Sequence, residues 1–293
     1  MTTSPASTTQ VWLITGSSRG FGKALCEAAL AAGHQVVATA RDPSRLADFE
    51  RRYGARVKTV ALDVTDAQAC LAAVATAVDS FGRLDVLVNN AGYGDVGPIE
   101  DTSLADFRSQ IETNLFGVIH MTKAAIPLMR GQGRGHVFQF SSIGGRIGPA
   151  GRAAYAAAKF GVEGFSEALA KEMAPLGVKV TIVEPGAFRT EFAGSSTRLN
   201  PGRAEYDATV GAMVRFQQAH DGKQAGDPDR AAAILLHLAT LDDPPLRIVL
   251  GRAAADAVEQ NDLAKVEAGR KWRESSVSAD YPETEHATID KSG

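Results

Sequence analysis

Two stretches decide the fold, Val137-Phe138-Gln139-Phe140-Ser141-Ser142 and Tyr155-Ala156-Ala157-Ala158-Lys159. The first stretch is apolar and β-prone, which predicts a short buried strand that ends at Ser142. Several glycines and a proline then break regular structure, and the alanine-rich composition predicts a helix from about Arg152. Residues four apart share one face of a helix, so the Tyr155 and Lys159 side chains should project together.

This pattern places Ser142 at the carboxyl end of a strand, which is where open α/β sheets bind ligands. Tyr155 and Lys159 form a candidate acid–base pair, because a nearby positive charge favours phenolate and lowers the tyrosine pKa. The Ser142 hydroxyl is a candidate to hold a carbonyl oxygen. Many helices carry the same spacing as a partly buried tyrosine with a solvated lysine, so the pair alone does not identify a site.

Short apolar strands alternate with helix-like segments along most of the chain. Strands are expected at residues 11–14, 35–40, 57–62, 84–88, 137–142, 178–183 and 247–250, and helices at about 23–32, 44–53, 66–81, 104–129, from 152, 229–241 and 252–275. This alternation implies parallel pairing with right-handed crossovers. The predicted fold is α/β, a doubly wound Rossmann fold with a single parallel sheet of about seven strands flanked by helices.

A glycine-rich loop, Thr15-Gly16-Ser17-Ser18-Arg19-Gly20-Phe21-Gly22, connects the first predicted strand to the first helix. Glycines let the backbone approach a pyrophosphate closely, and the helix N-terminus offers free N–H groups with a partial positive charge. The loop is therefore a candidate dinucleotide site, although an ordinary tight turn would have the same composition.

Composition and charge exclude several classes of function. The chain has 293 residues, 44% of them hydrophobic, and a net charge of −3, so neither nucleic acid nor an anionic membrane is an expected partner. The two cysteines, Cys26 and Cys70, are expected to be small buried fillers, which fits a reducing cytoplasm. The six histidines show no ligand spacing, and no metal site is expected. The most apolar helical segment, 231–239, is too short to span a bilayer.

One domain is expected over residues 10–251, preceded by a disordered Thr/Ser/Pro-rich tail at 1–9 that is not a signal peptide. Within it, residues 187–225 interrupt the strand–helix alternation and read as an irregular insertion that forms a binding loop or lid. A C-terminal helix and a loose tail are expected over 252–293.

Together these motifs resemble the short-chain dehydrogenase/reductase family, in its short single-domain branch, over about residues 10–251. The glycine spacing, the segment Asn89-Asn90-Ala91-Gly92, and the segment Pro185-Gly186 with Thr190 all match that family. Asn114, Ser142, Tyr155 and Lys159 match its catalytic tetrad in order and spacing.

The resemblance implies hydride transfer from NADPH to a carbonyl carbon while Tyr155 donates a proton to the oxygen. Ser142 would stabilise that oxygen, Lys159 would lower the Tyr155 pKa and bind the nicotinamide ribose, and Asn114 would interrupt its helix and anchor a water. The expected cofactor contacts are Gly16, Ser18, Arg19, Gly20, Phe21, Gly22, Arg41, Asp63, Val64, Asn90, Ala91, Gly92, Tyr155, Lys159, Pro185, Gly186, Phe188 and Thr190. The expected substrate pocket comprises Gly94, Val96, Ile143, Gly144, Pro149, Phe188, Phe192, Met213 and Phe216.

NADP(H) is the expected cofactor, because the end of the second strand in this fold faces the adenosine ribose. An acidic residue there would repel a 2′-phosphate, but this chain has Ala40 followed by Arg41, and Arg19 lies in the glycine loop. Two arginines can bind a dianion through charge-assisted hydrogen bonds. Asp42 is the complication, and the following Pro43 suggests that it turns outward to begin a helix.

The leading interpretation is therefore an NADPH-dependent carbonyl reductase that also runs as an alcohol dehydrogenase on an apolar ketone. A cofactor-binding regulatory or scaffolding protein is the alternative, and a dehalogenase-like relative is a third reading that Lys159 and the glycine loop oppose. Small residues on the predicted helices that contain Asn114 and Tyr155, together with the resemblance, suggest a homodimer or homotetramer.

Overall fold

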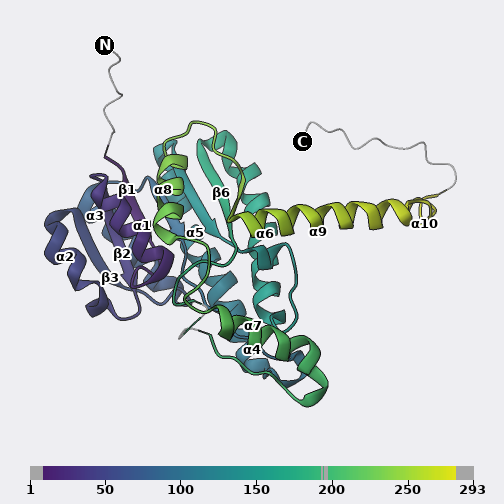
Figure 1. The fold of residues 1–293 in the computed structure, drawn as a ribbon. Coiled ribbons are helices and arrows are strands. Elements are labelled where there is room, and N and C mark those ends of the chain that lie inside the picture. Colours follow the sequence, from purple (N-terminus) through teal and green to yellow (C-terminus); the bar gives the residue numbers. More distant parts are fainter. Residues whose placement is uncertain (1–8, 193, 195–196, 282–293) are drawn as a thin grey trace, which may run out of the picture.

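The computed structural model describes residues 9–192, 194 and 197–281, so the tail expected at 1–9 and the end of the C-terminal tail lie almost wholly outside the described residues. Its centre is one parallel sheet of seven strands in the order β3-β2-β1-β4-β5-β6-β7 (Figure 1). The strands are β1 (Val11–Ile14), β2 (Gln35–Ala40), β3 (Val57–Ala61), β4 (Val86–Asn89), β5 (Gly135–Phe140), β6 (Val178–Pro185) and β7 (Arg247–Leu250). The predicted doubly wound sheet is confirmed.

Helices cover both faces of this sheet. They are α1 (Gly20–Ala31), α2 (Ala47–Tyr53), α3 (Ala67–Phe81), α4 (Leu104–Ile111), α5 (Gly117–Gln132), α6 (Ala153–Met173), α7 (Ala212–His220), α8 (Pro228–Leu238), α9 (Arg252–Lys271) and α10 (Arg273–Val277). Along β1, Trp12 and Ile14 pack into one core with α1, α2 and α8, while Val11 and Leu13 pack into the other with α3, α5 and α6. This alternation follows from the period of two in a strand. Both cysteines lie buried as free thiols in these cores, as expected.

Two expected segments differ from the structure. The helix expected over 104–129 is two helices joined by a π-helical turn, Glu112–Phe116. The insertion over 187–225 is not wholly irregular, because it contains a second π-turn, Asp207–Gly211, and the helix α7. The glycines and polar residues of the insertion suggested a loop, but the run Ala212-Met213-Val214-Arg215-Phe216-Gln217 is glycine-free and buries Val214 and Gln217 on one side.

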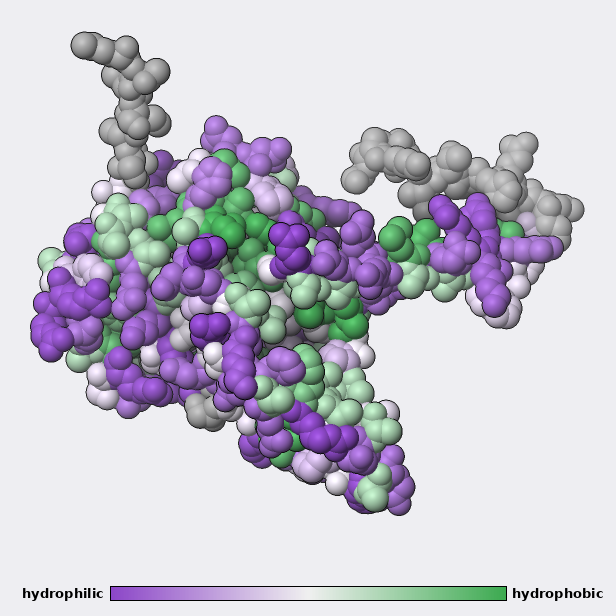
Figure 2. Space-filling view, viewed as in Figure 1, coloured by the Kyte–Doolittle hydropathy of each residue, from purple (hydrophilic) through white to green (hydrophobic). Residues whose placement is uncertain are grey.

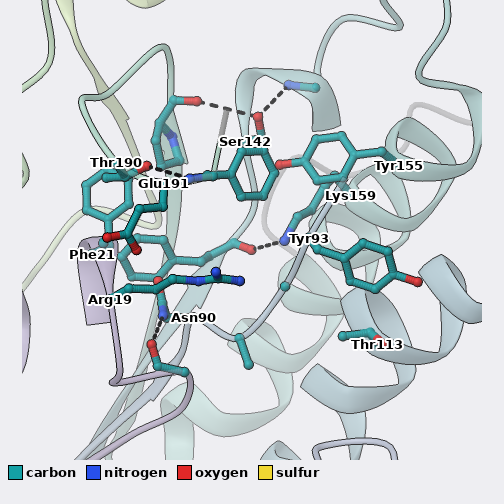
Figure 3. Close-up of a pocket in the computed structure, with 18 of the residues that line it drawn as sticks. Arg19, Phe21, Asn90, Tyr93, Thr113, Ser142, Tyr155, Lys159, Thr190 and Glu191 are labelled. Carbon is teal, nitrogen blue, oxygen red and sulfur yellow. Dashed lines mark hydrogen bonds between the residues drawn. The ribbon is translucent and has the colours of Figure 1, made fainter. Parts of the chain in front are cut away.

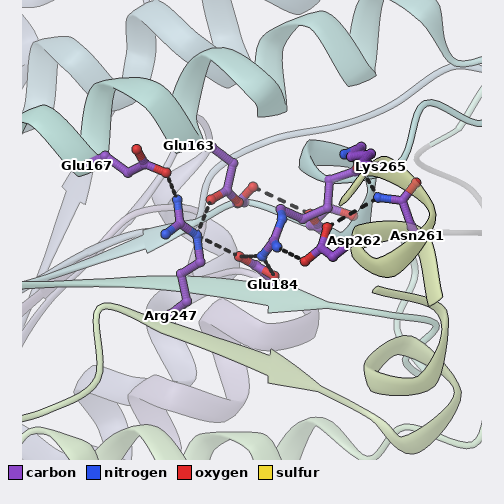
Figure 4. A network of polar contacts seen from close by, with 10 residues as sticks. Glu163, Glu167, Glu184, Arg247, Asn261, Asp262 and Lys265 are labelled. Atoms are coloured by element: carbon purple, nitrogen blue, oxygen red, sulfur yellow. Dashed lines mark hydrogen bonds and ion pairs between the residues drawn. The ribbon is translucent and has the colours of Figure 1, made fainter. Parts of the chain in front are cut away.

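The helix α9 leaves the body after its first turns, and α10 continues away from it (Figure 1). Near its middle, α9 contacts Arg146 in the loop after β5: Asn261 Nδ2 and Lys265 Nζ donate to the Arg146 carbonyl at 3.1 and 2.8 Å (Figure 4). The Arg146 guanidinium pairs with Asp262 of α9 and with the buried Glu184 of β6, at 3.0 Å. This polar network attaches the C-terminal helix to the loop that begins at Ser142.

In the space-filling view, hydrophilic and hydrophobic side chains are interspersed over the visible face of the body, and the C-terminal helices project from it (Figure 2). Among the described helices, none has the length and apolar character needed to cross a membrane.

Candidate active site

A large cavity of about 1350 Å³ opens at the carboxyl ends of the strands. All of the predicted cofactor and pocket residues line it except Gly22, Gly94 and Val96. Of the predicted catalytic residues, Ser142, Tyr155 and Lys159 line the cavity and lie close together, with Arg19, Phe21 and Asn90 in the same cavity (Figure 3). Asn114 is fully buried behind the wall.

The three exceptions have structural reasons. Val96 is only 2% exposed, because it packs against Val210 and Val214 of the insertion. Gly94 lies against the Tyr155 ring, where an added Cβ would come within 2.8 Å of a ring carbon. At Gly22 an added Cβ would collide with the Gly16 carbonyl, so this glycine permits α1 to pack against the loop. These residues shape the cavity from behind and do not line it.

Hydrogen bonds from Asn90 fix the conformation of the glycine loop. The Asn90 Nδ2 donates to the Thr15 carbonyl at 2.8 Å, and the Thr15 hydroxyl accepts from the Asn90 and Ala91 backbone N–H groups at 2.9 Å. Gly16 and Gly20 have φ angles of +70° and +52°, which a residue with a side chain rarely adopts. The loop therefore presents bare backbone and the N-terminus of α1 to the cavity.

Asn114 sits inside the π-turn between α4 and α5, so its helix is interrupted as the family resemblance implied. Its Oδ1 accepts from the Tyr93 N–H at 3.0 Å, and its Nδ2 donates to the Tyr93 and Gln110 carbonyls at 2.8 and 3.0 Å. A Cβ at Gly92 would lie 2.5 Å from the Asn114 Oδ1 and 3.8 Å from the Lys159 Nζ. Asn114 thus fixes the bare backbone that runs beside Lys159.

Tyr155 and Lys159 share the inner face of α6, as the four-residue spacing predicted, but their electrostatics differ from the expectation. Burial raises the pKa of Tyr155, and hydrogen bonding with Ser142 and the charge of Arg152 oppose that rise without overcoming it. Burial lowers the pKa of Lys159 to about 8, against the charge of Glu163. The Lys159 Nζ donates to the Phe140 carbonyl at 2.7 Å and lies 5.7 Å from the centroid of the Tyr155 ring. The net pKa of Tyr155 is therefore raised and not lowered as expected, because desolvation of the phenolate outweighs the favourable neighbours.

At the end of β2, Ala40 is 5% exposed and lines the cavity with Arg41. Asp42 also lines the cavity, and its carboxylate caps the next helical turn, accepting from the Ser44 N–H at 3.1 Å and the Ser44 hydroxyl at 2.6 Å. Within the described part of the chain, Arg19 and Arg41 take part in no hydrogen bond or ion pair that would occupy their guanidinium groups.

Sequence reasoning missed several cavity residues, notably Tyr93, Asp95, Arg152, Glu191 and Gln217. Tyr93 directly follows the segment Asn89-Asn90-Ala91-Gly92, and Arg152 precedes Tyr155 by three residues, so proximity to the motifs could have revealed both. Gln217 reaches the cavity from α7, and only the folded insertion brings it there.

Comparison with known proteins agrees with this geometry. Residues 10–200 match the family model described as short chain dehydrogenase. The chain belongs to the short-chain dehydrogenase family. As a short-chain dehydrogenase, it is an oxidoreductase.

Its similarity to individual short-chain dehydrogenases extends over nearly the whole chain. It is 44% identical to Oxidoreductase BOA17 of Botryotinia fuckeliana over 272 residues, which are 92% of this chain and 99% of that protein. A solved short-chain dehydrogenase from Streptomyces avermitilis superposes with a TM-score of 0.88 at 39% identity, covering 94% of this chain and all of that one. Another, from Burkholderia phymatum in complex with NAD, has a TM-score of 0.76 at 25% identity, covering 86% and 92%.

Proposed function

We propose that this short-chain dehydrogenase reduces a ketone or aldehyde to an alcohol with NADPH and catalyses the reverse oxidation with NADP⁺. The observation that carries this proposal is the grouping of Ser142, Tyr155 and Lys159 in the wall of the cavity that also contains the glycine loop. An acid–base group next to a dinucleotide site is what reversible hydride transfer at a carbonyl requires.

The residues present fit a nicotinamide dinucleotide. Backbone N–H groups of the glycine loop at the N-terminus of α1 would hold the pyrophosphate, and Arg19 and Arg41 would hold an adenosine 2′-phosphate. Lys159, with the bare backbone of Gly92 beside it, would hold the nicotinamide ribose. When bound, the cofactor supplies or accepts the hydride.

Side chains of the protein would supply the proton to the carbonyl oxygen. Because burial raises the pKa of Tyr155, its hydroxyl stays protonated at neutral pH and can donate to the carbonyl oxygen as negative charge develops there. The Ser142 Oγ accepts from the Gly144 N–H at 3.0 Å and donates to the Pro185 carbonyl at 3.5 Å. The substrate oxygen would replace the Pro185 carbonyl as the acceptor of this long hydrogen bond. Charged Lys159 would stabilise the phenolate that Tyr155 leaves behind.

The preference for NADP(H) over NAD(H) rests on Arg19 and Arg41, which line the cavity, and on Ala40, which stands where an acidic residue would repel a 2′-phosphate. Asp42 also lines the cavity. Asp42 is already engaged by Ser44. Family membership does not decide between the cofactors, and the preference is therefore part of the proposal. A homodimer or homotetramer is also proposed.

The direct test is a panel of ketones, aldehydes and secondary alcohols, with consumption or formation of reduced nicotinamide followed by absorbance. At least one carbonyl compound is expected to be reduced, and NADPH is expected to give a higher kcat/KM than NADH. Tight NADPH binding with no turnover of any compound would favour the scaffolding alternative.

A further inference from the structure

Arg152 lines the active-site cavity beside Tyr155, and neither the fold nor the proposed proton transfer accounts for it. Its guanidinium carbon lies 5.7 Å from the centroid of the Tyr155 ring. Its Nη2 donates to the Gln217 Oε1 at 2.6 Å, and its Nη1 donates to the Gly94 carbonyl at 3.4 Å. Both acceptors are neutral, and among the described residues no carboxylate forms an ion pair with Arg152.

The charges that favour the protonated form of Arg152 are those of Tyr155 and, after it, of Asp95, and Arg198 already engages the Asp95 carboxylate. The Asp95 Oδ2 accepts from the Arg198 Nε and Nη2 at 2.9 and 2.6 Å, and its Oδ1 accepts from the Arg198 backbone N–H at 3.0 Å. Burial lowers the pKa of Arg152, which indicates that its charge is poorly solvated. A buried charge without a bonded counter-charge is energetically costly, so binding of an anion next to Arg152 would be favourable.

The guanidinium group has five N–H donors in a planar fork, and its hydrogen bonds to Gly94 and Gln217 leave other N–H donors available. That fork matches the two oxygens of a carboxylate. A phosphate dianion would be only half neutralised by one guanidinium with Asp95 nearby. Phe192, Met213 and Phe216 supply an apolar wall in the same cavity, and the Phe192 ring lies 5.7 Å from the Tyr155 ring.

We propose that Arg152 binds a carboxylate of the substrate, so that the compound reduced beside Tyr155 is a keto acid with an apolar body. This inference rests on the proposed carbonyl reduction and narrows its substrate from an apolar ketone to an anionic one. Gln217 of α7 holds the guanidinium in place and thereby couples the insertion to the catalytic helix.

The test compares benzoate with benzamide, which has the same shape and no charge, by titration calorimetry with and without saturating NADP⁺. Bound NADP⁺ would occupy Arg19 and Arg41. A difference in affinity between benzoate and benzamide that persists with NADP⁺ bound then comes from the part of the cavity that contains Arg152. The parent protein is expected to bind benzoate about 10- to 100-fold more tightly than benzamide. Arg152→Gln is expected to reduce that ratio to about one, and Arg152→Lys to leave an intermediate ratio, because charge persists without the fork.

Arg108→Gln is the matched control, since Arg108 is an exposed cavity residue of α4 and the substitution removes the same charge. It should keep most of the preference for benzoate. Equal binding of the two compounds by the parent, no benzoate binding at all, or a preference that survives Arg152→Gln would each overturn the proposal. If Arg152→Gln fails to fold, the comparison of benzoate with benzamide in the parent protein still tests the proposal. A preference for benzoate in a protein that reduces no carbonyl compound would reject the proposed function and leave the carboxylate site standing.

Discussion

At the scale of single residues, the side chains that carry the proposed chemistry are buried, and burial controls their protonation. Tyr155 is 6% exposed and Lys159 is 4% exposed. Removing water disfavours the charged form of each group, which raises the tyrosine pKa and lowers the lysine pKa. The pair therefore rests as a neutral phenol beside an ammonium that loses its charge in mildly alkaline solution, a state suited to proton donation.

Tyr155→Phe is expected to lower turnover of a reducible ketone by about 10²- to 10⁴-fold, because only the proton donor is lost. NADPH affinity should remain nearly unchanged, as measured by fluorescence titration. Tyr53→Phe, which removes a hydroxyl on α2 outside the cavity, is the matched control and should retain normal turnover. Near-normal kcat in Tyr155→Phe would contradict the assignment.

Reduction should depend on the charge of Lys159. Its pKa is about 8, below the ordinary lysine value, so the charge is present below that pH and is lost as the pH rises through it. Tyr155 stays protonated over this range, because its pKa is raised. The kcat/KM for reduction, measured from about pH 6 to about pH 10, should therefore fall above about pH 8. In Lys159→Arg, whose charge does not titrate, the same fall should disappear; an unchanged midpoint would assign it to another group.

Cofactor choice is also decided at single residues. Arg19→Ser should weaken the NADPH preference by about ten- to a hundredfold, the value of one charge-assisted hydrogen bond. Ala40→Asp with Arg41→Ala should reverse the preference, because a carboxylate repels the 2′-phosphate and accepts from a ribose hydroxyl. The measurement is kcat/KM with NADPH and NADH for each variant. Equal values for the two cofactors in the parent protein would show that these arginines do not form the phosphate site.

At the scale of elements, one polar network joins β6, β7, α6 and α9 behind the catalytic loop (Figure 4). Glu184 of β6 is fully buried, accepts a hydrogen bond from Arg146 at 3.0 Å and forms an ion pair with Arg247 at 3.2 Å. Arg247 also pairs with Glu163 and Glu167 of α6. The carboxylate of Glu184 is thus the shared anion that lets two arginines lie side by side.

Glu184→Gln should lower the free energy of unfolding by about 3 kcal/mol, because it leaves two largely buried arginines without their shared charge. Asp262→Asn removes a carboxylate from the exposed end of the same network and should cost about 1 kcal/mol or less. Urea denaturation followed by circular dichroism measures both. Equal losses in the two variants would mean that burial does not govern this network.

At the scale of the whole molecule, α6 leaves part of its length uncovered. Ala157 and Gly164 are exposed, and Phe160 on the same face is 44% exposed. A face of small residues with one aromatic ring permits close approach of a second helix. Helix α6 carries Tyr155 and Lys159 on its inner face and the proposed contact on its outer face. Assembly would therefore stabilise the position of both side chains.

Light scattering is therefore expected to give two or four times the mass of one chain. Phe160→Glu should shift the population toward smaller species, since it places a charge in the proposed contact. Leu71→Glu makes the same kind of substitution at an exposed position of a different helix, α3, and should leave the mass unchanged. A parent protein that stays monomeric at micromolar concentration would exclude this assembly.

Local pattern was enough to predict the strands, most helices and the pairing of Tyr155 with Lys159, whereas Asn114 was predicted only from the family resemblance. An apolar run such as Val137-Phe138 specifies a buried strand wherever it occurs, and the four-residue spacing of Tyr155 and Lys159 brings them to one helix face in any context. The start of a helical turn at Asp42 was likewise readable, because capping by a carboxylate next to Pro43 is a local event.

Only the tertiary structure decided which predicted residues reach the cavity and how burial shifts their pKa values. Val96 was expected in the pocket, but Val210 and Val214, more than a hundred residues later, bury it. The pKa of Tyr155 goes up because neighbours distant in sequence exclude water, and Arg152 meets Gln217 only because the insertion folds back as α7. Backbone propensity and helix spacing are short-range properties that neighbouring residues determine, whereas desolvation and the pairing of buried charges depend on which distant segments the fold brings together.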